Sequence, residues 1–264
     1  MNAIPAQELG VLALPQNAAP ANSLHPHEAL DILLRQRFGV EYQPIVDTVS
    51  GDIAGFEALA RFWQADGSPV VPDRMFGLLH DNPLLLFHAE LEMKKLQIAA
   101  APDAGMLFLN IDPDSYNAGN VRESNVFAEL FAQHQRPGCE LVIEVIENLH
   151  IGDVLFTRLM IDDLKAVGVK IAMDDLGTSS GLFSFDAMMD SAFIKFDRSW
   201  LANIPERRRL TILEWTQKMI SQLGIKTVLE GVETRDDLLL AREMGFSFVQ
   251  GFLYSKDFVR KRFA

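Results

Sequence analysis

Residues Ile171–Gly177 read Ile-Ala-Met-Asp-Asp-Leu-Gly, a short apolar run that ends in two adjacent carboxylates and a glycine. Such a run is typical of a buried strand that carries charged side chains at its carboxyl end. Asp174 and Asp175 repel each other unless a cation or a shared proton lies between them, so the pair is costly as structure and useful as a metal or acid–base site. The alternative is a turn in which one aspartate caps the following helix. The recurrence of the same pattern along the chain favours the site.

Similar short apolar runs alternate with segments of helical periodicity along most of the chain. About eight strands interleaved with helices over about 240 residues are typical of a (β/α)8 barrel, and a doubly wound open sheet is the alternative. The start is irregular, because the first two strands follow each other across the turn Ser50-Gly51-Asp52 without a helix, as in a hairpin. Strands are expected at 38–46, 53–62, 106–111, 141–146, 170–173, 193–196, 227–229 and 246–250, and helices at 73–80, 86–101, 121–133, 153–167, 205–223 and 235–244.

Composition indicates one folded domain after a short tail. Residues 1–26 are rich in Ala, Pro, Asn and Gln without a sustained apolar period, which predicts a flexible tail before a domain at 27–264. The single cysteine, Cys139, excludes an intramolecular disulfide and fits a reducing cytoplasm. The chain shows neither a signal-peptide pattern nor an apolar run of about 20 residues, so we expect a cytoplasmic protein without a membrane anchor.

The formal net charge of -12 and the isoelectric point near 4.9 limit the expected partners. Nucleic acids and anionic membranes repel an acidic protein at long range, so neither DNA nor a membrane is an expected partner. An anionic substrate would need cationic side chains close to its binding site.

Most predicted strands carry a polar residue within them or near their carboxyl ends, and in a parallel barrel those ends converge on one face, where active sites of this fold are built. Carboxylates and an amide, without histidine or cysteine, suit Mg²⁺ or Mn²⁺ and suit zinc poorly. The histidines lack zinc-ligand spacing, and we expect His80, His88, His134 and His150 to be surface or packing residues. The polar residues are Glu57, Asn110, Glu144, Asp174 with Asp175, Lys195, Glu230 and Gln250.

Carboxylates that bind two divalent cations can hold a phosphodiester and activate a water molecule for in-line attack. Lys195 is the basic partner, which would orient or deprotonate that water or offset charge on the phosphate. The alternative for Lys195 is an ion pair with Asp197 or Asp175. Arg61, on the strand that carries Glu57, is placed to meet a phosphate or a purine edge, and its alternative is a surface ion pair.

Several of these residues stand in motifs that resemble the EAL domain family of cyclic di-GMP phosphodiesterases. The motifs occur in the family's order and spacing, and the resemblance covers roughly 27–257. They are Glu57-Ala58-Leu59 followed by Arg61, Asp174-Asp175 with Gly177, Ile194-Lys195 with Asp197, Glu230-Gly231-Val232-Glu233-Thr234, and Gln250-Gly251.

The resemblance implies a variant barrel with an antiparallel first strand, and hydrolysis of cyclic di-GMP to linear pGpG with two Mg²⁺ or Mn²⁺ ions. It implies that Lys195 contacts the nucleophilic water and that Glu230, with Glu57, belongs to the catalytic set. It also implies a homodimer. The resemblance implies two metal sites, one with the ligands Glu57, Asn110, Glu144 and Asp174 and the other with the ligands Asp174 and Asp175. It implies that Glu230 and Gln250 hold metal-bound waters or substrate and that Gln43 and Arg61 line the nucleotide groove. It also implies that Glu147 steadies the loop after Asp175.

The loop after the paired aspartates departs from the family pattern Asp-Asp-Phe-Gly-x-Gly-Tyr-Ser-Ser. This chain has Leu176 in place of the phenylalanine and continues Gly-Thr-Ser-Ser-Gly at 177–181. Because the family uses this loop to couple dimerisation to metal and substrate binding, a second hypothesis is a weak or inactive domain that serves as a cyclic di-GMP receptor or a protein-interaction regulator. We expect control through expression, oligomerisation or a protein partner.

Overall fold

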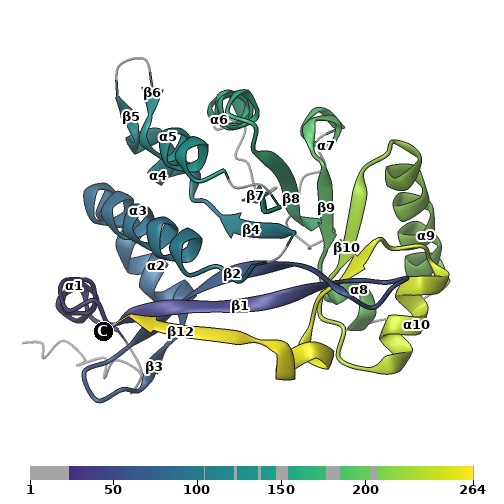
Figure 1. The fold of residues 1–264 in the computed structure, drawn as a ribbon, viewed down its shortest axis with the longest axis horizontal. Coiled ribbons are helices and arrows are strands. Elements are labelled where there is room, and N and C mark those ends of the chain that lie inside the picture. The colour runs from purple at the N-terminus through teal and green to yellow at the C-terminus, as the bar shows by residue number, and fades with distance from the viewer. Residues whose placement is uncertain are drawn as a thin grey trace, which may run out of the picture.

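The computed structural model describes residues 24–103, 105–121, 124–135, 138–146, 154–176, 185–202 and 207–263 (Figure 1). Within these residues, eight strands form a ring in the order β1-β11-β10-β9-β8-β7-β4-β2, and the pairing of β1 with β2 closes it. The strands of this barrel are β1 (Phe38–Asp47), β2 (Ile53–Trp63), β4 (Met106–Asn110), β7 (Glu140–Ile146), β8 (Lys170–Leu176), β9 (Phe193–Phe196), β10 (Lys226–Leu229) and β11 (Phe248–Val249).

The first strand runs against both of its neighbours. β1 is antiparallel to β2 along most of its length, and its last two residues, Val46 and Asp47, are antiparallel to β11. The other pairings around the ring are parallel. The prediction of a (β/α)8 barrel with an antiparallel first strand is therefore confirmed, and the open-sheet alternative is wrong.

Helices lie outside the strands, and apolar residues between helices and strands form two clusters around the barrel (Figure 1). None of the helices in the described ranges is long and apolar enough to cross a membrane. The helices are α1 (Pro26–Leu34), α2 (Pro72–His80), α3 (Pro83–Ala99), α4 (Pro113–Ala118), α5 (Val126–Gln133), α6 (Val154–Ala166), α7 (Phe185–Asp190), α8 (Ser199–Ala202), α9 (Arg207–Gln222), α10 (Arg235–Glu243) and the 3-10 helix η1 (Phe252–Asp257).

Apolar side chains from six strands fill the interior of the barrel. Phe108 and Phe193 meet edge to face, with ring centroids 5.1 Å apart. On β2 the facing position is Gly55, where a Cβ atom would lie 2.5 Å from the Met106 carbonyl oxygen, so the crowded interior requires glycine there. The six residues are Ile45, Phe108, Val142, Ala172, Phe193 and Val228.

Several predicted boundaries differ from the structure, among them those of the helix at 121–133 and the strand at 170–173. The helix expected at 121–133 begins at Val126, because the Asn125 side chain accepts a hydrogen bond from the Phe127 backbone N–H at 2.9 Å and caps α5. The residues before it pair instead as β5 (Asn120–Val121) and β6 (Ser124–Asn125). The strand expected at 170–173 extends to Leu176 as β8, so Asp174 lies inside a strand and does not cap a helix.

Besides β5 and β6, two further strands were not expected from the sequence. β3 (Pro69–Val70) pairs with the end of β2. β12 (Val259–Phe263) pairs antiparallel with the first half of β1, along the edge that β11 leaves free. Figure 1 shows that β12 brings the C-terminal end of the chain back to the first strand.

Candidate active site

The site residues form a layer above the apolar interior. Side chains alternate along a strand, so a residue two positions beyond an interior residue points the same way and lies closer to the carboxyl end of the strand. This spacing relates Phe108 to Asn110 on β4 and Phe193 to Lys195 on β9. It also relates Gly55 to Glu57, Val142 to Glu144, Ala172 to Asp174, Val228 to Glu230 and Phe248 to Gln250. The strands therefore bring these predicted residues together at one end of the barrel.

Lys195 lies at the centre of this layer and is only 1% exposed. Burial alone would lower the pKa of Lys195, but the charges of the surrounding carboxylates, Asp174 foremost, raise it well above its usual range. With these carboxylates as its neighbours, Lys195 is a protonated donor. Its Nζ atom lies 2.7 Å from Glu144 Oε1, 2.7 Å from Glu230 Oε1, 3.2 Å from Asp174 Oδ1 and 3.4 Å from Glu57 Oε2.

The carboxylates carry more negative charge than the lysine can balance. Burial raises the pKa of Glu144 well above its usual range, and the charge of Glu57 adds to this effect. Burial likewise raises the pKa of Glu230, to about 8. Burial would also raise the pKa of Glu57, but the charge of Lys195 and hydrogen bonds lower it instead. Four carboxylates around one ammonium group thus leave room for additional positive charge.

The donor set fits a hard divalent cation. Glu144 is fully buried, and its Oε2 atom has no hydrogen-bond partner among the described residues. An unpaired buried carboxylate oxygen is costly unless a cation or a proton meets it. The neighbouring donors are carboxylate oxygens and the Asn110 amide, which suit Mg²⁺ and Mn²⁺. We therefore judge that these residues fit the metals expected from the sequence.

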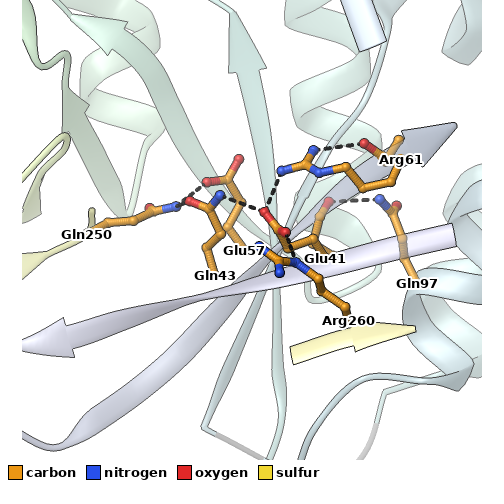
Figure 2. A network of polar contacts seen from close by, with 9 residues as sticks. Glu41, Gln43, Glu57, Arg61, Gln97, Gln250 and Arg260 are labelled. Carbon is orange, nitrogen blue, oxygen red and sulfur yellow. Dashed lines mark hydrogen bonds and ion pairs between the residues drawn. The ribbon is translucent and has the colours of Figure 1, made fainter. Parts of the chain in front are cut away.

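Two amides orient Glu57. Asn110 Nδ2 donates to Glu57 Oε1 at 3.0 Å, and Gln250 Nε2 donates to Glu57 Oε2 at 2.5 Å. Gln250 Nε2 also lies 3.5 Å from Gln43 Oε1, so the amide connects β11 with β1 and β2 (Figure 2). Both oxygens of the Glu57 carboxylate are thus held by amide side chains, one from β4 and one from the residue directly after β11.

A buried glutamate that sequence reasoning missed holds Arg61. Glu41 is 6% exposed and accepts hydrogen bonds from Arg61 Nη2 at 2.6 Å, from Gln43 Nε2 at 3.1 Å and from Arg260 Nε (Figure 2). Burial would raise the pKa of Glu41, but these hydrogen bonds, that of Arg260 first, lower it. Arg61 thus forms an ion pair, as in the alternative given for this residue, but its partner Glu41 is buried and not on the surface.

A cavity of about 610 Å³ covers the layer. This volume is in the range of small-molecule binding sites. On one side the cavity continues over α2 and α3, and on the other it reaches Arg198 and Phe252. The predicted site residues that line it are Gln43, Glu57, Arg61, Asn110, Asp174, Lys195, Glu230 and Gln250.

Some predicted contacts are absent or cannot be placed. Asp197 is not paired with Lys195, because its Oδ1 accepts a hydrogen bond from the Ser199 backbone N–H at 2.8 Å. Glu147 lies outside the described residues, as does the side chain of Asp175. Of the loop that departs from the family pattern, Leu176 is described: it is buried, and its carbonyl oxygen accepts a hydrogen bond from Trp200 Nε1 at 2.8 Å.

Of the described histidines, His88 and His134 are surface or packing residues as expected, whereas His80 lies in a group with Asp112 and Asp114 whose ligand atoms are within 4.8 Å of one another. His88 is exposed, and His134 Nδ1 lies 2.8 Å from the Leu130 carbonyl oxygen. His80 is half exposed at the cavity wall, with Nε2 3.3 Å from Asp112 Oδ2. His150 lies outside the described residues.

Residues 27–257 match the family model described as the EAL domain. The chain belongs to the EAL domain family. This EAL domain is 27% identical over 225 residues to the cyclic di-GMP phosphodiesterase NbdA of Pseudomonas aeruginosa, a match that covers 82% of this chain and 28% of NbdA. It is also 27% identical over 247 residues to the probable cyclic di-GMP phosphodiesterase PdeN of Escherichia coli, covering 88% of this chain and 47% of PdeN.

A solved structure supports the same relationship. The manganese and cyclic di-GMP complex of BlrP1 from Klebsiella pneumoniae is 25% identical to this EAL domain, with a TM-score of 0.66. The match covers 83% of this chain and 55% of BlrP1. The EAL domain therefore spans about a quarter to a half of these relatives, which contain further sequence.

Proposed function

We propose that this EAL domain hydrolyses cyclic di-GMP to linear pGpG in a reaction that depends on two Mg²⁺ or Mn²⁺ ions. The observation that carries the proposal is the buried cluster of Glu57, Glu144, Asp174 and Glu230 around Lys195 at the base of the cavity. The names of NbdA and PdeN, and the ligands in the BlrP1 complex, support the same substrate and a divalent metal.

Glu57, Asn110, Glu144 and Asp174 would hold one metal ion, and Asp174 with Asp175 would hold the second. When bound, the ions would lower the pKa of a water molecule and offset negative charge on the phosphate. The amides of Asn110 and Gln250 keep Glu57 in a fixed orientation for this role.

The protein's own groups would place the reactants. Lys195, fixed by its neighbours, would donate a hydrogen bond to the attacking water and offset charge that develops on the phosphate. Arg61 extends along the cavity and can donate to a phosphate or a guanine edge, while Glu41 limits its motion. Gln43 and Gln250 add amide groups beside the same wall. We expect these contacts to orient the dinucleotide for in-line attack.

The alternative is a domain that binds cyclic di-GMP without efficient hydrolysis and acts as a receptor or through a protein partner. The altered sequence at 176–181 favours this alternative, because it lies directly after the paired aspartates. The altered loop also bears on the proposed homodimer, because this loop would couple the two subunits. Light scattering with and without the dinucleotide would test the homodimer.

The deciding experiment is incubation of the purified chain with cyclic di-GMP in Mg²⁺, in Mn²⁺ and in EDTA, with chromatography of the products. Metal-dependent appearance of pGpG would support the enzyme. Binding measured by calorimetry without any pGpG in either metal would favour the receptor.

A further inference from the structure

Three arginines lie on one face of the small sheet that β12, β1 and β2 form. Residues directly opposite each other in antiparallel strands point to the same side, and the side alternates along each strand. Arg61 of β2 and Arg262 of β12 both lie opposite Gly39 of β1, and Arg260 lies opposite Glu41. Since Gly39 and Glu41 are two positions apart, the three arginines share a face. Figure 2 shows Arg61 and Arg260 meeting at Glu41 from opposite sides.

This face holds a groove of about 300 Å³. Its walls include Glu41, the three arginines and Trp63 at the end of β2. Among these five residues, Arg61 is the one that also lines the cavity above the strand ends. The groove therefore adjoins the cavity at a single arginine and otherwise has its own walls.

The positive charge of the groove exceeds the charge available to balance it. Glu41 is the one carboxylate among the described residues of the groove, and it already accepts hydrogen bonds from Arg61 and Arg260. Arg262 forms no ion pair with any carboxylate that the structure describes; its Cζ atom instead lies 4.4 Å from the centroid of the Trp63 ring. A guanidinium group stacked on a ring keeps its N–H donors free at its edge. Three cations thus face one anion, in a chain whose net charge is -12.

Gly39 makes this arrangement possible. A Cβ atom at this position would clash with the Lys261 carbonyl oxygen and would lie 3.1 Å from Trp63 Cη2. The absence of a side chain therefore lets β12 approach β1 and leaves the space across which Arg262 reaches Trp63.

We propose that this groove binds a compact, multiply charged phosphate group of the pyrophosphate class, held by Arg260 and Arg262 with Arg61 at the inner end. A guanidinium group can donate two parallel hydrogen bonds to a phosphate, and the contacts with Glu41 and Trp63 hold these groups in place beforehand. The volume is at the lower end for small-molecule sites. Long polyanions are repelled by the negative charge of the whole chain, so a small anion fits better.

Calorimetry of the whole chain with inorganic pyrophosphate in EDTA tests the proposal. EDTA removes divalent cations that could bridge pyrophosphate to the carboxylates of the cavity. We expect saturable binding, and Arg262→Met should weaken it about 10-fold, the loss expected for one charge-assisted hydrogen bond. Arg262→Lys should lose less, because it keeps the charge without the planar fork. If GTP binds more tightly than pyrophosphate, and Arg262→Met weakens both, the groove recognises the phosphates of a nucleotide.

The neighbouring lysine provides a matched control. Lys261 is exposed and carries the same charge, but alternation along β12 turns its side chain to the opposite face. Lys261→Met should therefore change the affinity by less than about 2-fold at physiological salt. Thermal melting identifies variants that do not fold.

No binding of pyrophosphate by the wild type at millimolar concentration would overturn the site. Equal losses in Arg262→Met and Lys261→Met would do the same, because they would reflect general attraction of anions. Binding of an acidic peptide without binding of pyrophosphate would also overturn the phosphate ligand. These outcomes do not depend on whether the chain hydrolyses cyclic di-GMP.

Discussion

Replacing Lys195 with methionine should destabilise the metal-free domain by about 3–5 kcal/mol, the usual cost of removing one partner from a buried ion pair. Methionine keeps most of the length of the lysine stem, so packing changes little. The ammonium group, however, contacts four carboxylates within 3.4 Å and is 1% exposed. Without it, those carboxylates face one another with no cation between them.

The loss should depend on pH, because the carboxylates can take up protons. The pKa of Glu230 is already about 8 in the folded domain, above the ordinary value of 4.5, and Glu144 is raised as well. Removing Lys195 raises the pKa values of Glu230 and Glu144 further, so the folded variant binds more protons than its unfolded chain. The stability of the variant therefore falls as the pH rises through these pKa values. The destabilisation should therefore be larger at about pH 8 than at about pH 6.

Urea denaturation in EDTA at both pH values measures the effect, and Lys165→Met is the control. Lys165 pairs with Asp190 at 2.6 Å but is 44% exposed, so its loss should cost less than about 1 kcal/mol. Millimolar Mg²⁺ or Mn²⁺ should restore part of the stability of the Lys195 variant, since cations bind only the folded site. A loss below about 1 kcal/mol at the higher pH, or equal effects at Lys195 and Lys165, would refute the argument that Lys195 holds the carboxylates together.

Three further predictions concern other parts of the site. Glu57→Gln should abolish pGpG formation if Glu57 is the metal ligand proposed above, and unchanged turnover would contradict that assignment. Glu41→Gln should lower the unfolding free energy by about 1–3 kcal/mol. Hydrogen bonds lower the pKa of Glu41 in the folded domain, so this stabilisation is present above about pH 4.5 and is lost as the pH falls through the pKa of Glu41 in the folded state. Urea denaturation curves of the variant and the wild type should therefore converge in acid. Leu176→Phe should raise the hydrolysis rate if the altered loop is a weakened coupling element, and an unchanged rate would make that substitution neutral.

Local patterns were sufficient to predict the barrel and the layer of polar residues above its interior. A parallel strand such as β9 is short and apolar, so Lys195 stands out within it, and alternation determines the side on which it lies. The same holds for Asp174 in β8. What each side chain contacts, however, depends on which strands become neighbours. Lys195 was therefore predicted as the basic partner of the site, while its contacts with Glu144 and Glu230 became apparent only in the structure.

Other features could not be predicted because their cause lies far away in the chain or in competing local bonds. Arg260 reaches Glu41 across 219 positions, and nothing in either segment signals the contact. Glu90 and Lys94 of α3 form a buried ion pair, yet they look like an ordinary pair on a helix surface until the helix is packed, since their spacing equals that of exposed pairs. The start of α5 was misplaced because the prediction continued the helix through Ser124 and Asn125, which are weak helix formers, and Asn125 instead caps the helix.

The reversed direction of β1 explains why one wall of the cavity is built as it is. In the parallel strands the residue two positions after the interior position faces the cavity, whereas in β1 it is the residue two positions before: Gln43 lies two positions before Ile45. Glu41 continues the same face outward, and β12 places Arg260 directly opposite it in the ladder. On β2, Arg61 shares a face with Glu57 by the same alternation. A parallel first strand would end at the cavity and turn away into a helix. The antiparallel hairpin instead continues past the barrel rim, and this extension positions Arg61 beside the residues proposed to bind metal.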